Sequence, residues 1–113
     1  MADKIGSFDH DANSGSTESY KLFPGENGTL LRYENGLDVD VDVEIEATIG
    51  EDKANFNKSE DLRVSGGSPG AKTVKSNKYD SDYLTEPWDI LKVKVTPASD
   101  PTSGTFTLRK MIR

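Results

Sequence analysis

The sequence contains no cysteine, and that absence removes several kinds of chemistry at once. Without thiols there is no disulfide, no zinc–thiolate site and no cysteine nucleophile. The single histidine, His10, lies in a polar stretch that offers nothing to hold an imidazole rigid, as a catalytic triad requires. Apolar runs are far too short to cross a bilayer, and the first residues lack the charged-then-apolar order of a secretory signal. We therefore expect a protein that folds in a cytoplasm and binds no membrane.

Basic residues are outnumbered by acidic ones, 14 to 20, which sets the net charge at −6. This balance disfavours a nucleic-acid partner, because binding it requires Lys and Arg to neutralise phosphates. The acidity has two open interpretations. It either keeps the protein soluble or reflects a source adapted to high salt, where short carboxylates keep a surface hydrated.

The chain has 113 residues, enough for one domain, but its composition is not uniform. Residues 1–19 are rich in Asp, Ser, Gly and Asn, and after the initiator Met their only sizeable apolar side chains are Ile5 and Phe8. Such a stretch buries too little apolar surface to offset its ordering entropy. We therefore predict an extended polar N-terminal arm over residues 1–19 and a folded domain over residues 20–113. Ile5 and Phe8 would anchor the arm on other chains.

The clearest pattern in the chain is the strict alternation of residues 37–49. Leu37 and every second residue up to Ile49 are apolar, whereas the residues between them are acidic or Thr. This period of two predicts a half-buried strand. No helical periodicity of useful length is present, so we predict an all-β fold, a single antiparallel β-sandwich or jelly-roll-like domain. Shorter patterns predict strands at residues 20–23, 29–33, 62–64, 73–75, 88–96 and 105–113, with loops at 51–61 and 76–87.

The link into the long strand predicts a hairpin. A three-residue loop over residues 34–36, closed by a left-handed Gly36, places Leu31 and Tyr33 on the same face as the apolar residues of the long strand. A two-residue turn would instead put Leu31 on the same face as Asp38. We therefore predict the three-residue loop, with Gly36 at positive φ.

The row of acidic side chains on the long strand could be considered as a calcium-binding site. The ion needs about six to eight converging oxygens at about 2.3–2.6 Å, whereas same-face neighbours on a strand lie about 6.6–6.8 Å apart. A straight strand cannot wrap one ion, so we expect no metal site. The acidic side chains should instead form a hydrated face that pairs with Lys92 and Lys94 on a neighbouring strand. They are Asp38, Asp40, Asp42, Glu44 and Glu46.

No segment carries the arrangement of a catalytic or nucleotide-binding site. Residues 66–73 approach the phosphate-binding loop, but Ala71 replaces its second required glycine, and a β pattern rather than a helix follows. No carboxylate stands in an apolar stretch that would raise its pKa. We therefore expect no catalytic residue, no cofactor and no enzyme activity.

Three aromatic residues, Tyr79, Tyr83 and Trp88, lie close together in the sequence. Trp88 follows Pro87 at the entry of a predicted strand, where an aromatic side chain can plug the end of a sandwich. If the three rings are exposed and coplanar, they would instead form a platform for a sugar or a protein partner. Both interpretations remain open.

The C-terminal quarter of the chain resembles a known class of proteins. Residues 86–97 read EPWDILKVKVTP, and residues 100–108 read DPTSGTFTL. This order of an aromatic-led strand, a Pro-Thr-Ser-Gly turn and a final strand is similar to the closing hairpin of small β-sandwich virion proteins from tailed viruses of bacteria and archaea. With its acidic composition, the chain most resembles a capsid decoration (cement) protein of a haloarchaeal tailed virus.

The resemblance implies a virion structural protein, assembled in the host cytoplasm, that stabilises the capsid lattice. Its partners would be the major capsid protein or other virion subunits, including copies of itself, and no catalytic, cofactor or metal residues are implied. A carbohydrate- or cell-surface-binding β-module, including a tail or collar component, is the alternative. The candidate partner-contact residues are Ile5, Phe8, Tyr79, Tyr83 and Trp88.

Overall fold

The computed structural model describes residues 3–11, 15–23, 28–49, 52–55, 72–84 and 90–112. These residues form β-strands, and none of them forms a helix that could span a membrane. The strands are β1 (Asp3–Asp9), β2 (Glu18–Leu22), β3 (Thr29–Asn35), β4 (Val41–Ile49), β5 (Asp52–Asn55), β6 (Lys72–Val74), β7 (Lys78–Leu84), β8 (Ile90–Pro97) and β9 (Thr105–Ile112).

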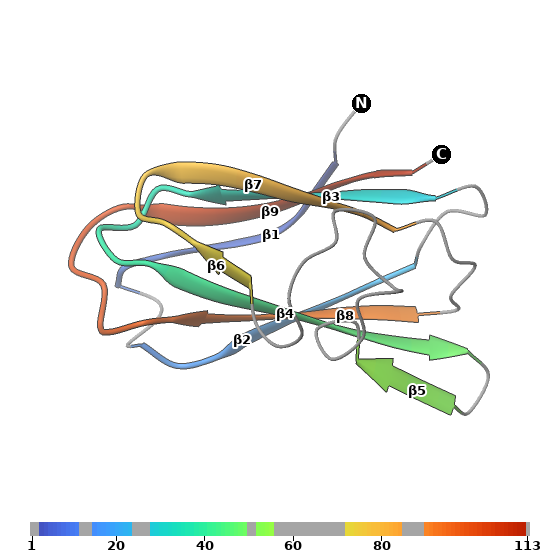
Figure 1. Cartoon of the computed structure of the whole chain (residues 1–113). Helices are drawn as coiled ribbons and strands as arrows, with labels where there is room; N and C mark the ends of the chain where they lie inside the picture. Colours follow the sequence, from blue (N-terminus) through green and yellow to red (C-terminus); the bar gives the residue numbers. More distant parts are fainter. Residues whose placement is uncertain are drawn as a thin grey trace.

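The strands form two antiparallel sheets that pack face to face (Figure 1). Sheet A has the order β1-β9-β3-β7, and sheet B has the order β2-β8-β4-β5, with β6 also pairing with β4. β5 pairs with residues 46–49 of β4, whereas β6 pairs with residues 41–43. When β5 and β6 are counted as one interrupted strand, the two orders are those of an eight-stranded jelly roll. The predicted antiparallel β-sandwich is confirmed.

The core lies between the two sheets. Burial alternates along β3 and β8, because each strand turns only one face toward the other sheet. The period of two in the sequence therefore becomes a pattern of inward and outward side chains. The buried core residues are Phe8, Leu22, Leu31, Tyr33, Leu37, Val41, Val43, Ile45, Val74, Leu84, Leu91, Val93, Val95, Phe106 and Leu108.

The hairpin predicted at residues 34–36 is wrong, although the predicted faces are right. β3 lies in sheet A and β4 in sheet B, so the chain crosses between the sheets at this point. Leu31 and Tyr33 are nevertheless completely buried. Two strands that face each other across a core bury the same alternate residues as two strands paired in one sheet. The long strand also begins later than predicted, at Val41, because residues 37–39 form bends.

Gly36 does not have the positive φ that the hairpin required. Among the described glycines, Gly15, Gly28 and Gly104 have that conformation. The Gly36 N–H instead donates a hydrogen bond of 2.9 Å to the carbonyl of Thr105, where the crossing chain meets the start of β9. A Cβ on Gly36 would lie 2.7 Å from that carbonyl oxygen, and a Cβ on Gly104 would collide with the Gly36 carbonyl. Close approach of two backbones therefore requires glycine at both positions.

The predicted N-terminal arm also differs from the structure. Residues 3–9 form β1, an edge strand of sheet A that pairs with β9. Phe8 is buried and stacks on Phe106, with 5.6 Å between the ring centroids, and Ile5 packs against the same core. The sandwich therefore begins well before residue 20. The prediction failed because an edge strand needs apolar side chains on one face only. Backbone hydrogen bonds to the neighbouring strand offset the remaining entropy cost of ordering it.

Other expectations about strands are corrected as well. Residues 76–87, predicted as a loop, contain β7, and residues 51–61 contain β5. β7 lacks an apolar alternation because its inward side chains include Asp80 and Asp82. The two strands of the predicted closing hairpin, β8 and β9, lie in different sheets. The strand predicted at residues 62–64 lies outside the described residues.

Candidate functional site

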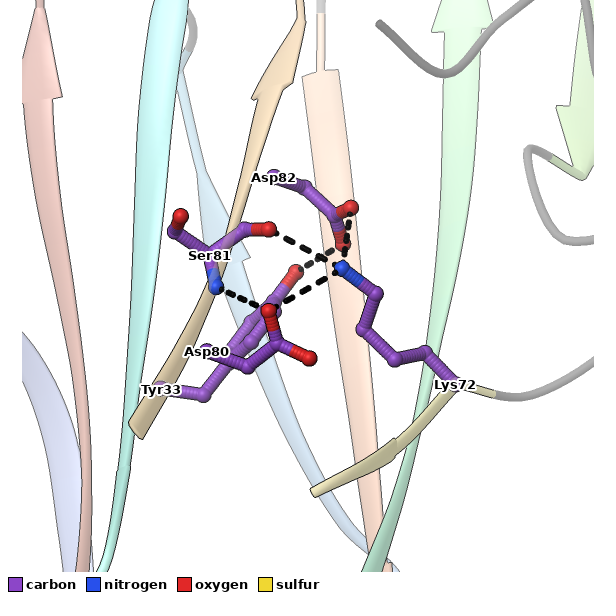
Figure 2. Close-up of polar contacts among 5 residues, drawn as sticks. All are labelled: Tyr33, Lys72, Asp80, Ser81 and Asp82. Atoms are coloured by element: carbon purple, nitrogen blue, oxygen red, sulfur yellow. Dashed lines mark hydrogen bonds and ion pairs between the residues drawn. The ribbon is translucent and has the colours of Figure 1, made fainter. Parts of the chain in front are cut away.

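A partly buried polar cluster joins β7 of sheet A to β6 of sheet B (Figure 2). The side chain of Asp82 is 1% exposed, and its two carboxylate oxygens have different partners. One accepts a hydrogen bond of 2.8 Å from the Tyr33 hydroxyl, and the other lies 2.9 Å from the ammonium nitrogen of Lys72. Lys72 also donates to the carbonyl of Ser81 at 2.9 Å and lies 3.4 Å from a carboxylate oxygen of Asp80.

The elements that supply this cluster explain its role. Lys72 comes from β6 in sheet B, whereas Tyr33 and Asp82 come from β3 and β7 in sheet A. Removing two charges from water is costly unless each is paired and hydrogen-bonded, and here each charge is the partner of the other. We interpret Tyr33, Lys72 and Asp82 as a structural clamp between the sheets, because the Lys72 ammonium is already engaged by three oxygen acceptors.

A second buried side chain, Asn35, organises the end of the sandwich where the chain crosses between sheets. Its amide nitrogen donates to the carbonyls of Val39 and Val74, both at 3.0 Å, and to the carbonyl of Lys75 at 3.2 Å. Its amide oxygen accepts a hydrogen bond of 3.0 Å from the N–H of Leu37. One amide thereby ties β3, the crossing segment and the end of β6 together.

Two of the acidic residues that we expected on a hydrated face brace loops at this same end. Asp38 accepts hydrogen bonds from the hydroxyl and the N–H of Thr102, at 2.5 and 2.9 Å, and these bonds hold the pKa of Asp38 below its usual value. Asp40 accepts a hydrogen bond of 2.9 Å from the N–H of Ser76, the main cause of its lowered pKa, and lies 3.3 Å from the Lys75 ammonium. Both carboxylates therefore stabilise the loops in their charged form.

Glu44 and Glu46 lie on β4 beside the lysines of β8, as predicted, whereas Asp42 stands opposite a threonine of β8 and accepts a hydrogen bond of 2.8 Å from the hydroxyl of Thr73 on β6. Glu44 and Glu46 pair in register with Lys94 and Lys92, and the Lys94 ammonium lies 2.5 Å from a carboxylate oxygen of Glu46. That hydrogen bond raises the pKa of Lys94. Within the described ranges, no three acidic or histidine side chains gather as a metal ion would require.

The outer face of sheet A carries a different charge pattern. Lys4 of β1, Arg109 of β9 and Arg32 of β3 stand directly opposite one another on three neighbouring strands, and we term them the cationic row. Glu34 joins the two arginines: Arg32 Nε donates to one of its carboxylate oxygens at 2.9 Å, and Arg109 Nε donates to the other at 3.1 Å. The Arg32 guanidinium also stacks over the ring of Tyr79, 4.9 Å from its centroid.

Tyr79 lines two open depressions on this face. Tyr79 is 71% exposed and is, with Phe23, one of the large exposed apolar residues in the described part of the chain. The first depression, about 260 Å³, has polar walls that include Glu34, Asn77, Thr105 and Thr107. The second depression, about 340 Å³, is lined by Leu30, Arg32, Tyr79, Asp80 and Ser81. The cationic row, Tyr79 and these depressions together form one continuous candidate binding surface.

The five predicted partner-contact residues fall into three groups. Ile5 and Phe8 pack into the protein's own core, so they are not available to a partner in this structure. Tyr79 is exposed and Tyr83 is half-buried. Trp88 lies outside the described residues. The structure thus brings Tyr79, but not Ile5 or Phe8, to a surface.

Sequence reasoning missed several residues of this surface. Arg32, Glu34 and Arg109 come together only because β3 pairs with β9, and nothing in the local sequence indicates that pairing. On the other sheet, Phe23 just after β2 is 65% exposed, which its place in a predicted strand does not indicate. A signal that could have identified Arg32 is its position between Leu31 and Tyr33, which places it on the outward face.

Comparisons with known proteins establish the fold. No protein-family model matches the chain, and no curated protein does. The structure is similar to the C-terminal domain of a structural protein from Sulfolobus turreted icosahedral virus, with a TM-score of 0.50 and 14% identity over 99% of this chain and 100% of that one. It is also similar to a periplasmic inhibitor of g-type lysozyme from Aeromonas hydrophila, with a TM-score of 0.50 and 13% identity over 100% of this chain and 85% of that one.

A xylan-binding domain also matches, with a TM-score of 0.36 and 12% identity over 81% of this chain and 60% of that one. This value is too low to carry an argument. At such identities the likenesses show the fold alone, a shared β-sandwich.

Proposed function

We propose that this chain is a virion structural protein, and specifically a capsid decoration protein that stabilises the lattice through subunit contacts. The observation that carries the proposal is the jelly-roll fold, which aligns over 99% of the chain with an entire domain of a viral structural protein. The partners would be the major capsid protein or other virion subunits, including copies of the chain, without nucleic acid, cofactor or catalysis.

The internal bracing of the sandwich supports this role. A subunit that reinforces a lattice must be rigid, because any ordering on binding is subtracted from its affinity. The clamp and the Asn35 hydrogen bonds join the sheets from within. Phe23 and Tyr79 are large side chains that are 65% and 71% exposed, and we propose them as contacts in place of Ile5 and Phe8.

Analysis of purified particles tests both parts of the proposal, the presence of the chain in the virion and its role as a capsid decoration protein. The chain should co-purify with capsids in many copies, as measured by quantitative mass spectrometry, and immunogold labelling should place it over the capsid shell. Particles made without the chain should still form but should release their genome at a lower temperature. Absence of the chain from purified particles would refute the virion role. Labelling confined to the tail or collar would refute only the decoration role.

A carbohydrate- or cell-surface-binding module, including a tail or collar component, is the second candidate. One observation favours it, namely the exposed Tyr79 side chain beside two depressions, of which the first has polar walls. A glycan array tests it with the intact chain. Specific retention of the chain on a class of glycans supports this candidate, and uniform absence of retention contradicts it.

A further inference from the structure

We propose that the outer face of sheet A binds an acidic polysaccharide, with the cationic row holding its carboxylates and Tyr79 packing against its sugar rings. This inference deepens the second candidate function and rests on it. It does not depend on a role in the capsid, because a surface that binds acidic sugars is compatible with either location in a particle.

The charge distribution distinguishes this face. The chain carries a net charge of −6, yet Lys4 stands opposite Arg109, and Arg109 stands opposite Arg32. Side chains opposed in this way have Cβ atoms about 4.5–5.5 Å apart, and like charges at that separation are destabilising. Among the described residues, Glu34 is the acid that pairs with both arginines, and one carboxylate cannot neutralise three cations. An anionic ligand would remove the remaining repulsion.

Both arginines retain donors for such a ligand. In the described part of the chain, Arg32 and Arg109 each donate to Glu34 through Nε, and their terminal amino groups make no hydrogen bond. The two side chains are 48% and 36% exposed, so solvent reaches them. A planar guanidinium matches a carboxylate with two parallel N–H donors. Two guanidinium groups on adjacent strands therefore suit a polymer that carries carboxylates in series.

Tyr79 supplies the second element of recognition. Its ring offers a flat apolar surface with a polar hydroxyl at the edge, and it lines both depressions. The side chains of Asn77, Thr105 and Thr107 form polar walls of the first depression. Amides and hydroxyls both donate and accept hydrogen bonds, as the hydroxyls of a sugar ring require. The combination of cations, a flat ring and bifunctional polar groups matches an acidic sugar better than a simple anion.

An acidic protein segment is the competing occupant. Sandwich domains take up peptides at an unpaired sheet edge, where backbone groups add a new strand. Arg32 and Arg109 lie on β3 and β9, and each of these strands is paired on both sides within sheet A. Recognition by these two arginines must therefore come from side chains on the face of the sheet, whereas Lys4 and Tyr79 stand on the edge strands β1 and β7. This favours a polymer that is held through carboxylates and hydroxyls rather than through its backbone.

Isothermal titration calorimetry of the full chain against polygalacturonate at low ionic strength tests the inference. We expect binding that weakens as salt is raised, because exposed ion pairs are screened. Arg32→Gln and Arg109→Gln should each weaken binding about tenfold, the effect of losing one charge-assisted hydrogen-bonded contact. Tyr79→Ala should also weaken it. Lys92→Gln is the matched control, since it removes an exposed cation from the outer face of sheet B, and it should leave the affinity unchanged.

Titrations with two further polymers show which part of the inference is wrong if one of these results is not obtained. Fully methyl-esterified polygalacturonate, the same sugar without its charge, should bind at least tenfold more weakly; equal binding would refute the acidic specificity and leave a sugar-binding function standing. Equal binding of poly-L-glutamate would assign the surface to an acidic protein segment and overturn the inference. Absence of binding to polygalacturonate, or an equal loss in Lys92→Gln, would overturn it as well. A cooperative thermal unfolding transition shows that each variant is folded.

Discussion

At the scale of single residues, the side chains that break the alternating pattern are the ones that join the two sheets. Asp82 occupies an inward position of β7 where an apolar side chain would be expected, and Lys72 reaches it from β6. Asn35 occupies an inward position at the end of β3. Asp82 and Asn35 are buried, and both have hydrogen-bond partners on another element. These hydrogen bonds specify which strands lie together, whereas the contacts of an apolar side chain would not.

The clamp leads to a first prediction. Lys72→Met should reduce the free energy of unfolding by about 3–5 kcal/mol, because it leaves the carboxylate of Asp82 buried without its cation. The double variant Lys72→Met/Asp82→Asn should recover a large part of that loss, since the neutral amide can still accept the Tyr33 hydrogen bond. Urea unfolding measures both.

Lys75→Met is the control for the clamp, because it removes a lysine just beyond β6 whose side chain is 71% exposed. It should have a much smaller effect, as exposed ion pairs contribute little. If Lys72→Met and Lys75→Met destabilise equally, the clamp does not hold the sheets together.

The loop-bracing aspartates lead to a prediction about pH. The folded protein lowers the pKa of Asp38 and Asp40, so their contribution to stability is present above the ordinary carboxyl pKa and is lost as pH falls through the lowered value. The free energy of unfolding should therefore decrease on acidification below about pH 4. Asp38→Asn should be less stable than the wild type near neutral pH, yet lose less on acidification.

Thr102→Ala provides a matched test, because it removes the hydroxyl that makes the largest contribution to the lowered pKa of Asp38. Its profile of unfolding free energy against pH should also be flatter than that of the wild type. Parallel profiles for all three proteins would show that Asp38 does not contribute to acid sensitivity.

At the scale of elements, β1 shows how a polar segment becomes part of a sandwich. Its outward residues are exposed, whereas Phe8 enters the core against Phe106. Phe8→Ala should therefore destabilise the domain by about 3–5 kcal/mol, the usual loss for a buried Phe. The adjacent exposed change Ser7→Ala should have little effect in the same thermal unfolding experiment. A fully stable Phe8→Ala variant that failed only in assembly would restore the arm interpretation.

At the scale of the whole molecule, the excess of acid should govern the response to ions. Monovalent salt should raise the melting temperature, because it screens repulsion within a chain of net charge −6 and within the cationic row. Calcium chloride should act only through its ionic strength, since Glu46 is paired with Lys94 and Asp38 and Asp40 are bonded to loops. Differential scanning calorimetry in sodium and calcium chloride at equal ionic strength should give coincident melting temperatures. A saturable rise with calcium alone would reveal an ion site.

The sequence by itself determined the fold class and the inward faces of β3 and β4. Alternation is a local property, so Leu31, Tyr33, Val41 and Val43 could be assigned to a core without knowledge of the topology. The pairing of the acidic face of β4 with the lysines of β8 was also predictable, because opposite charges on outward faces of neighbouring strands attract.

Only the tertiary structure decided which strands pair and which surface a partner meets. Alternation identifies the buried face of a strand but not the strand beside it, so a crossing between sheets and a hairpin look alike in the sequence. Residues of β1 and β7 gain their order from β9, β3 and β6, which lie far away along the chain. The cationic row exists for the same reason, because the register of β1, β9 and β3 sets Lys4, Arg109 and Arg32 opposite one another.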